Sequence, residues 1–117
     1  MGERTRLAIV GFGNIGKGVL EAISQNPDME AAVVVSRDPQ RVRRDLPGIP
    51  VCGVEDSGAL DQADVAILCG GSKRDLPIQG PVFARRIHTV DSFDNHGEIP
   101  AYFAAMDQAA QAAGTVA

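Results

Sequence analysis

The sequence lacks an excess of basic charge, and this sets it apart from chains that bind polyanions. It carries 11 lysines and arginines against 15 aspartates and glutamates, so its formal net charge is −4. A chain with this balance has no general electrostatic attraction to nucleic acid or to anionic membranes. We therefore expect neither of these as a partner.

Long uninterrupted apolar stretches are also missing. A membrane-spanning helix needs about 20 consecutive apolar residues, and the longest apolar runs of this chain are far shorter. The N-terminal segment MGERTR leads straight into a strand-like run and lacks the apolar core of a signal peptide. The sequence therefore predicts a cytoplasmic protein without a membrane segment.

Cysteine is scarce, since Cys52 and Cys69 are the only two. Their spacing is not that of metal ligands, and both lie in apolar surroundings, which predicts reduced core residues and no metal site. The length of 117 residues and the hydrophobic content of 44% suit one soluble globular domain. Neither an internal repeat nor a linker divides the chain, so we expect a single domain over residues 1–117.

Apolar strand-like runs alternate with segments of helical periodicity along the whole chain. The predicted strands are Leu7–Val10, Ala31–Val35, Val51–Val54, Val65–Cys69 and Ile87–Val90. The predicted helices are Asn14–Asn26, Pro39–Asp45, Ser57–Gln62, Pro77–Arg86 and Glu98–Ala113, with Gly114 as the C-cap of the last. This order is typical of an α/β, Rossmann-type doubly wound parallel sheet. Residues 115–117 resemble the opening of another strand, so we expect the sheet to be truncated before its last strand.

The first strand runs into the segment GFGNIG, which places Gly11, Gly13 and Gly16 in the G-x-G-x-x-G pattern. In a dinucleotide-binding turn the first glycine permits the tight turn, and the second lets the backbone approach a pyrophosphate. The third glycine lets helix and strand pack closely, and the helix N-terminus offers N–H groups to phosphates. The alternatives are a plain tight turn and the related glycine loop of methyltransferases that use S-adenosylmethionine.

The end of the second strand bears on the choice of dinucleotide. Enzymes that use NAD usually place an acid there to hold the ribose hydroxyls, whereas this strand ends in Ser36-Arg37. A hydroxyl and a guanidinium suit the 2′-phosphate of NADP, and we interpret Asp38, followed by Pro39, as a helix cap. The sequence thus favours NADP over NAD; the alternative for Arg37 is an exposed surface arginine.

A second glycine turn, Gly70-Gly71, follows the fourth strand. Ligands of an open α/β sheet lie outside the carboxyl ends of the strands, and two glycines let a cofactor approach the backbone. Ser72, Lys73 and Arg74 are then candidates to meet the pyrophosphate or a ribose. The alternative is a flexible turn with solvated charges.

The fifth strand is followed by the polar segment DSFDNHGEIP, residues 91–100. It lies on the same predicted edge, beside the nicotinamide half of a bound cofactor, where an acid suits a cationic substrate group. The alternative is that Asn95 or Asp94 caps the helix that starts near Glu98. We interpret His96 as a turn residue.

Several of these motifs together resemble those of the meso-diaminopimelate dehydrogenase family. The resemblance rests on GFGNIG, SRD, CGGS, the PDM after the first helix, AAGTVA and above all VDSFDNHGEIP, and it runs through the whole chain. It implies an NADP-dependent homodimer that oxidatively deaminates the D-centre of meso-2,6-diaminopimelate to L-2-amino-6-oxopimelate and ammonia. It also implies a role in making the lysine and peptidoglycan precursor, and a substrate domain that follows the cofactor domain.

The resemblance also implies roles for individual residues. Ser36 and Arg37 fall at the 2′-phosphate, and the other cofactor contacts that it implies are Phe12, Gly13, Asn14, Ile15, Ser72, Lys73, Arg74, Asp75 and Leu76. The two glycine patterns add Gly11, Gly16, Gly70 and Gly71 to the expected cofactor-binding residues. Asp91, Ser92 and Phe93 lie near the nicotinamide, while Asp94, with Asp91, belongs to the substrate-binding acids. No catalytic residue is assigned.

This sequence departs from the family at Asp38, where the family often has a second arginine. The family's remaining substrate residues are expected downstream of Ala117. A rival of another class is a stand-alone dinucleotide-binding, redox-sensing module without catalysis.

Overall fold

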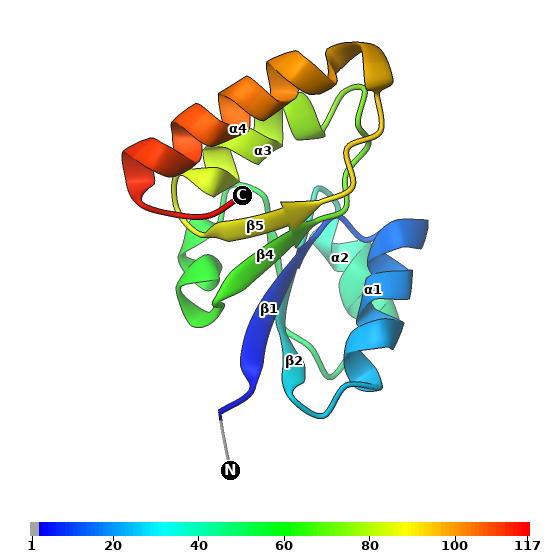
Figure 1. The fold of residues 1–117 in the computed structure, drawn as a ribbon. Helices are drawn as coiled ribbons and strands as arrows, with labels where there is room; N and C mark the ends of the chain where they lie inside the picture. The colour runs from blue at the N-terminus through cyan, green and yellow to red at the C-terminus, as the bar shows by residue number, and fades with distance from the viewer. Residues whose placement is uncertain (1–2) are drawn as a thin grey trace.

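Five short strands form one sheet in which every neighbouring pair is parallel (Figure 1). This is a computed structural model, and it describes residues 3–117 apart from the side chains at 57 and 59. The strands are β1 (Thr5–Val10), β2 (Met29–Ser36), β3 (Val51–Gly53), β4 (Val65–Leu68) and β5 (His88–Asp91). Their order is β3-β2-β1-β4-β5, so the chain crosses over from β3 to β4 at the middle of the sheet. The predicted doubly wound parallel sheet is confirmed.

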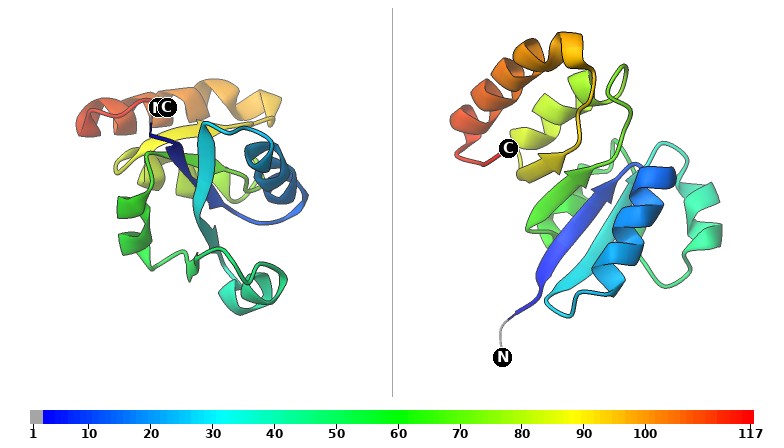
Figure 2. Two further views of the ribbon diagram at one scale, coloured as in Figure 1. Left: turned by 90° about the horizontal axis from the view of Figure 1, so that it is seen from below. Right: turned by 45° about the vertical axis from the view of Figure 1, so that its right-hand side comes forward.

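Helices cover both faces of the sheet (Figure 2). They are α1 (Asn14–Ser24), α2 (Pro39–Asp45), α3 (Leu76–Ala84) and α4 (Ile99–Ala113), with the 3₁₀ helices η1 (Ser57–Gln62) and η2 (His96–Glu98). Side chains of α1 and α2 pack on one face, and those of η1, α3 and α4 pack on the other. The two crossovers that join β1, β2 and β3 therefore lie on one face, and the two that join β3, β4 and β5 lie on the other, as in a doubly wound sheet.

The last four residues of β1, from 7 to 10, are all apolar, and the structure shows why. Leu7 and Ile9 point into the core under α1 and α2, while Ala8 and Val10 point into the core under α3 and α4. All four side chains are at most 4% exposed, because successive residues of a strand face opposite sides and both sides are covered. A strand buried on both faces tolerates no polar residue in its centre.

The end of the chain differs from its prediction. Residues 115–117 form no strand of their own; the carbonyl of Val116 accepts a hydrogen bond from the N–H of Thr89 in β5 at 2.9 Å. The N–H of Val116 donates to Nδ1 of His88 at 3.0 Å. One main-chain bond does not make a β ladder, so these residues only lie beside β5. Gly114 is the left-handed C-cap of α4, with φ of 73°, as predicted.

Both cysteines are buried and unpaired, as expected of core residues. Burial raises the pKa of the Cys69 thiol to about 11, so it stays protonated at neutral pH. In the described part of the chain, no helix combines the length and the hydrophobicity needed to cross a membrane. Residues 3–117 also contain no cluster of three or more histidine, cysteine or acidic side chains that suits a metal ion.

Candidate cofactor-binding site

The first glycine turn has a backbone that only glycine fits. Gly11 has a φ of 94°, in the left-handed region, and its N–H donates to the carbonyl of Val35 at 2.8 Å. A Cβ atom on Gly11 would lie 3.3 Å from the backbone of Cys69 and Gly70. The turn is therefore held between the ends of β2 and β4 at the carboxyl edge of the sheet.

The other two glycines of the motif have opposite surroundings. A Cβ on Gly16 would collide with the carbonyl oxygen of Gly11, so the close approach of α1 to the turn depends on this glycine. A Cβ on Gly13 would meet nothing within 4 Å. Gly13 is also the N-cap of α1 and provides no side-chain hydrogen bond to the first turn. The backbone around Gly13 is thus open to a ligand.

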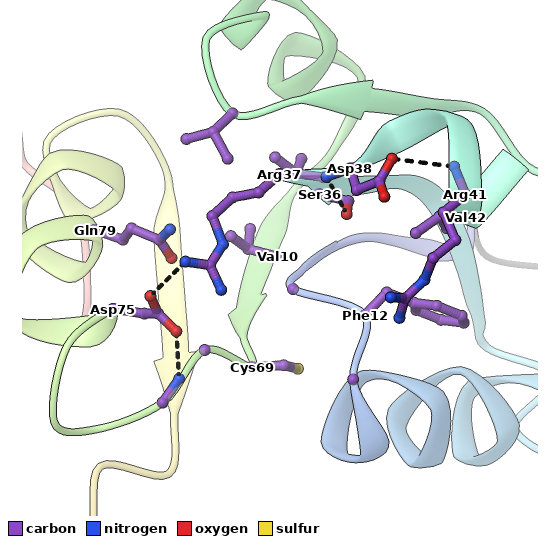
Figure 3. Close-up of a pocket in the computed structure, with 16 residues that line it drawn as sticks. Val10, Phe12, Ser36, Arg37, Asp38, Arg41, Val42, Cys69, Asp75 and Gln79 are labelled. Atoms are coloured by element: carbon purple, nitrogen blue, oxygen red, sulfur yellow. Dashed lines mark hydrogen bonds and ion pairs between the residues drawn. The ribbon is translucent and has the colours of Figure 1, made fainter.

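A cavity of about 370 Å³ lies over this turn, at the carboxyl ends of β1, β2 and β4 (Figure 3). Eight of the predicted cofactor-binding residues line it: Gly11, Phe12, Gly13, Ser36, Arg37, Gly70, Gly71 and Asp75. The other predicted residues do not line this cavity: Asn14, Ile15, Gly16, Ser72, Lys73, Arg74, Leu76, Asp91, Ser92 and Phe93. Leu76 is 1% exposed and belongs to the core, whereas Ile15 is 53% exposed beside the turn.

The residues after β2 are arranged by short-range hydrogen bonds. The Oγ atom of Ser36 accepts from the N–H of Asp38 at 3.0 Å, and Oδ1 of Asp38 accepts from the N–H of Arg41 at 3.4 Å. Asp38 is therefore the N-cap of α2, with Pro39 in the first turn, and the capping interpretation is confirmed. Because this carboxylate serves the helix, β2 does not end in a free acid of the kind that holds ribose hydroxyls.

An ion pair crosses the cavity between the loops after β2 and β4. The guanidinium of Arg37 lies 3.4 Å from Oδ1 of Asp75, while Oδ2 of Asp75 accepts from the N–H of Gly71 at 3.0 Å (Figure 3). A Cβ on Gly70 would approach the Cβ of Asp75 to 2.8 Å, so this glycine lets the second turn close over the aspartate. The Arg37 side chain is 76% exposed, and such an exposed pair holds it only weakly.

Sequence reasoning missed several residues of the cavity wall. They are Val10, Val35, Asp38, Arg41, Val42, Val54, Cys69 and Gln79. The position of Arg41 could have been predicted from the sequence. It follows the cap Asp38 by three residues, and side chains three or four residues apart in a helix lie on the same face. The position of Gln79 could not, because it reaches the cavity from α3, far from the glycine motif in the sequence.

The loops after β4 and β5 meet at a second, open cavity of about 570 Å³. The N–H of Asp94 donates to Oγ of Ser72 at 2.9 Å and ties the two loops together. The cavity is lined by Gly71, Ser72, Lys73, Arg74, Asp75, Asp94 and Asn95. Neither η2 nor α4 receives a side-chain cap hydrogen bond, so the structure does not support Asp94 or Asn95 as a cap.

Asp91 has protein partners for both of its carboxylate oxygens. Oδ1 accepts from the N–H of Phe93 at 2.9 Å, and Oδ2 accepts from the hydroxyl of Tyr102 in α4 at 2.8 Å. The rings of Phe93 and Tyr102 stack with centroids 4.0 Å apart. Burial and the bond to Asp91 raise the pKa of the Tyr102 phenol, which stays a neutral donor. By contrast, the exposed Asp94 carboxylate has no hydrogen bond or ion pair within residues 3–117.

A glycine turn under an open cavity, at the point where the strand order reverses, defines a Rossmann-type dinucleotide-binding domain. Comparison with protein families gives the narrower assignment. The chain belongs to the family described as "NADP oxidoreductase coenzyme F420-dependent", whose model matches residues 6–73.

Among curated relatives, the chain is 51% identical over 117 residues to meso-diaminopimelate D-dehydrogenase of Ureibacillus thermosphaericus, covering 98% of this chain and 36% of the relative. It also matches the solved diaminopimelate dehydrogenase of C. glutamicum in complex with DAP, at 42% identity and a TM-score of 0.84 over 97% of this chain and 34% of that one. The structure of an engineered D-amino acid dehydrogenase bound to NADP+ matches at 42% identity and a TM-score of 0.83. The match covers 95% of this chain and 34% of that one. The chain thus spans about a third of the length of these relatives.

Proposed function

We propose that this chain supplies the NADP-binding part of an enzyme that oxidatively deaminates meso-2,6-diaminopimelate at its D-centre. The products would be L-2-amino-6-oxopimelate and ammonia, in the pathway to lysine and peptidoglycan precursors. The observation that carries this proposal is the 51% identity to a meso-diaminopimelate D-dehydrogenase, which extends over 98% of the chain. The similarity to a dehydrogenase structure bound to NADP+ supports the cofactor.

The glycine turn and the residues at the end of β2 offer groups that suit the phosphates of a dinucleotide. The turn leaves open space at Gly13, where a pyrophosphate would lie against the start of α1. Ser36 and Arg37 stand at the end of β2, where the 2′-phosphate would lie, and Gly70 and Gly71 would border the middle of the cofactor. When bound, NADP+ accepts the hydride; the chain binds it and fixes its orientation.

The second cavity is the proposed entry of the substrate into this domain. The Asp94 carboxylate is exposed beside Ser72, on the edge shared by β4 and β5. An anionic group at this place would hold a substrate ammonium by a charge-assisted hydrogen bond. Asp91 would act less directly, since its two bonds shape the loop that carries Asp94.

We also propose a cytoplasmic homodimer. The two buried, unpaired cysteines suit a reducing compartment. Dimerisation is what the resemblance to the dehydrogenase family implies, and light scattering of the complete gene product measures it directly.

The test of the reaction is reduction of NADP+ by the complete gene product in the presence of meso-diaminopimelate. We expect turnover with the meso isomer and none with the LL isomer, which has the same groups but no D-centre. Ammonia should form in equal amount to NADPH. Equal rates with both isomers, or no turnover with either, would refute the proposed reaction.

The cofactor assignment has its own test in Arg37→Ala. A charge-assisted hydrogen bond contributes about 1.5–3 kcal/mol, so NADPH binding should weaken by about ten- to a hundredfold. NADH has no 2′-phosphate, and its affinity should stay nearly unchanged. Equal losses for the two cofactors in a calorimetric titration would disprove the contact between Arg37 and the phosphate.

A further inference from the structure

Arg41 is a second arginine on the wall of the cofactor cavity. It lies in the first turn of α2, and the main-chain bond from its N–H to Asp38 fixes its backbone. Figure 3 shows its side chain reaching back from α2 toward Phe12 of the glycine turn, while Arg37 extends to the opposite wall toward Asp75. The two guanidinium groups therefore stand on either side of the space beside Ser36.

The charges of the cavity wall single out Arg41. Arg37 and Arg41 are its cations, and Asp38 and Asp75 are its acids. Asp75 is engaged by Arg37 and by the N–H of Gly71, and Asp38 caps α2. Among the residues that the structure describes, the Arg41 guanidinium has neither an ion pair nor a hydrogen bond. The Arg41 guanidinium can bind an anion without breaking any contact within the protein. The Arg37 guanidinium would have to give up its ion pair with Asp75.

A phosphate monoester is the group that this arrangement suits. Such a phosphate carries about −1.5 to −2 charges at pH 7, more than one guanidinium shared with Asp75 can neutralise. A guanidinium on each side and the Ser36 hydroxyl would supply charge and donors together. We propose that Arg41 is a second ligand of the adenosine 2′-phosphate and that it sets, with Arg37, the preference for NADP over NAD. This inference rests on the proposed function.

The experiment compares Arg41→Gln with Arg44→Gln in the complete gene product. Both changes remove one positive charge from α2, but Arg44 does not line the cavity. Calorimetry would measure the dissociation constants of four ligands: NADPH, NADH, adenosine 2′,5′-bisphosphate and 5′-AMP. For Arg41→Gln we expect about tenfold weaker binding of the two ligands with a 2′-phosphate, and less than about twofold change for the other two. For Arg44→Gln we expect less than about twofold change throughout.

The possible outcomes distinguish a failure of the role of Arg41 from a failure of the proposed NADP-binding function. If the wild-type protein binds NADPH more tightly than NADH and Arg41→Gln leaves that ratio unchanged, Arg41 is not a phosphate ligand. Equal losses of affinity for NADPH and NADH would also overturn the inference, because Arg41 would then contact a part of the molecule that both cofactors have in common. If the wild-type protein binds no NADPH, the proposed function fails together with this inference. Circular dichroism should show the same helix content in both variants, since the Asp38 cap bonds only main-chain N–H of residue 41.

Discussion

The two halves of the sheet edge use their polar groups in different ways. Beside β1 and β2, a Cβ on Gly13 would meet nothing within 4 Å, and the guanidinium of Arg41 has no ion pair or hydrogen bond among residues 3–117. Beside β5, the carboxylate of Asp91 is bonded to Phe93 and Tyr102. A polar group that the protein leaves free is available to a ligand, whereas one that the protein satisfies holds the fold. The guanidinium of Arg41 is therefore available to a ligand, whereas the carboxylate of Asp91 ties the loop after β5 to α4.

The difference depends on how closely α3 and α4 pack. A Cβ on Gly80 of α3 would lie 2.5 Å from the Tyr102 hydroxyl and 2.9 Å from Sδ of Met106. The missing side chain lets α4 come close enough for Tyr102 to reach Asp91 at 2.8 Å. A packing detail between two helices thus decides which acid of the segment 91–94 remains free.

The largest effect is expected from Gly16→Ala, which changes the first glycine turn. Its Cβ would collide with the carbonyl of Gly11, and backbone cannot move aside as a flexible side chain can. We expect a loss of about 3 kcal/mol in the free energy of unfolding, with NADPH binding lost as α1 moves away from the turn. Gly18→Ala is the matched control in the same helix, because its Cβ meets nothing within 4 Å. It should stabilise the chain by up to about 1 kcal/mol, and similar unfolding curves for both variants would contradict the close approach.

Asp94→Asn tests the free acid of the second half. In the complete gene product we expect kcat/KM for meso-diaminopimelate to fall by about ten- to a hundredfold, as one charge-assisted contact is lost. Stability and NADPH affinity should not change, because this carboxylate caps no helix. Asp107→Asn, the same change on the exposed face of α4, is the control. An unchanged kcat/KM together with a lower free energy of unfolding would mean that Asp94 stabilises the fold and does not bind the substrate.

Tyr102→Phe tests the satisfied acid. It removes the hydroxyl bonded to Asp91 and keeps the ring stacked on Phe93, so we expect a loss of about 1–2 kcal/mol in the free energy of unfolding. Chemical denaturation at neutral pH measures this loss. An unchanged stability would mean that the bond to Asp91 contributes nothing.

The same tyrosine predicts an alkaline limit of stability. Its pKa is raised in the folded state, whereas the unfolded phenol titrates near its usual value of about 10. Its contribution is thus complete below about pH 10 and is lost as the pH rises toward the folded-state pKa, because only the unfolded chain gains by releasing the proton. As the chain has one tyrosine, tyrosinate absorbance follows this group alone. A titration midpoint near 10 in the folded protein would contradict its burial beside Asp91.

The smallest effect is expected from Asp75→Asn, which keeps an oxygen for the N–H of Gly71 and removes the ion pair with Arg37. An exposed pair of this kind contributes about 0.2–1 kcal/mol. Freeing Arg37 should therefore tighten NADPH binding by up to about fivefold and leave NADH binding unchanged. Weaker NADPH binding would mean that Asp75 holds Arg37 in place for the phosphate and does not compete with it.

Local pattern was enough to predict the strands, the helices and the glycine turn. Gly11, Gly13 and Gly16 have surroundings that follow from their spacing, and Asp38 caps α2 because the cap and its helix are neighbours in sequence. The fifth strand is shifted by one residue, to His88–Asp91, so that Asp91 lies opposite Leu68.

Contacts between distant elements could not be predicted in this way. The pair of Arg37 with Asp75 joins residues from the loops after β2 and β4, and Tyr102 meets Asp91 from the next helix. Whether an acid after a strand is free or satisfied depends on such contacts, which no spacing in the sequence specifies. The family resemblance assigned Asp94 and Asp91 to the substrate-binding acids, and this assignment stays a prediction. The structure adds that only the Asp91 carboxylate has protein partners among residues 3–117.

The most direct measurement of the central claim is the affinity of the chain for NADPH and for NADH, side by side in one buffer. If the cavity beside Ser36, Arg37 and Arg41 is built for a 2′-phosphate, NADPH should bind at least about tenfold more tightly. The difference should shrink as salt is added, because phosphate contacts are screened. S-adenosylmethionine should give no binding and no thermal protection. Equal affinities for NADPH and NADH, or protection by S-adenosylmethionine, would contradict this account of the site.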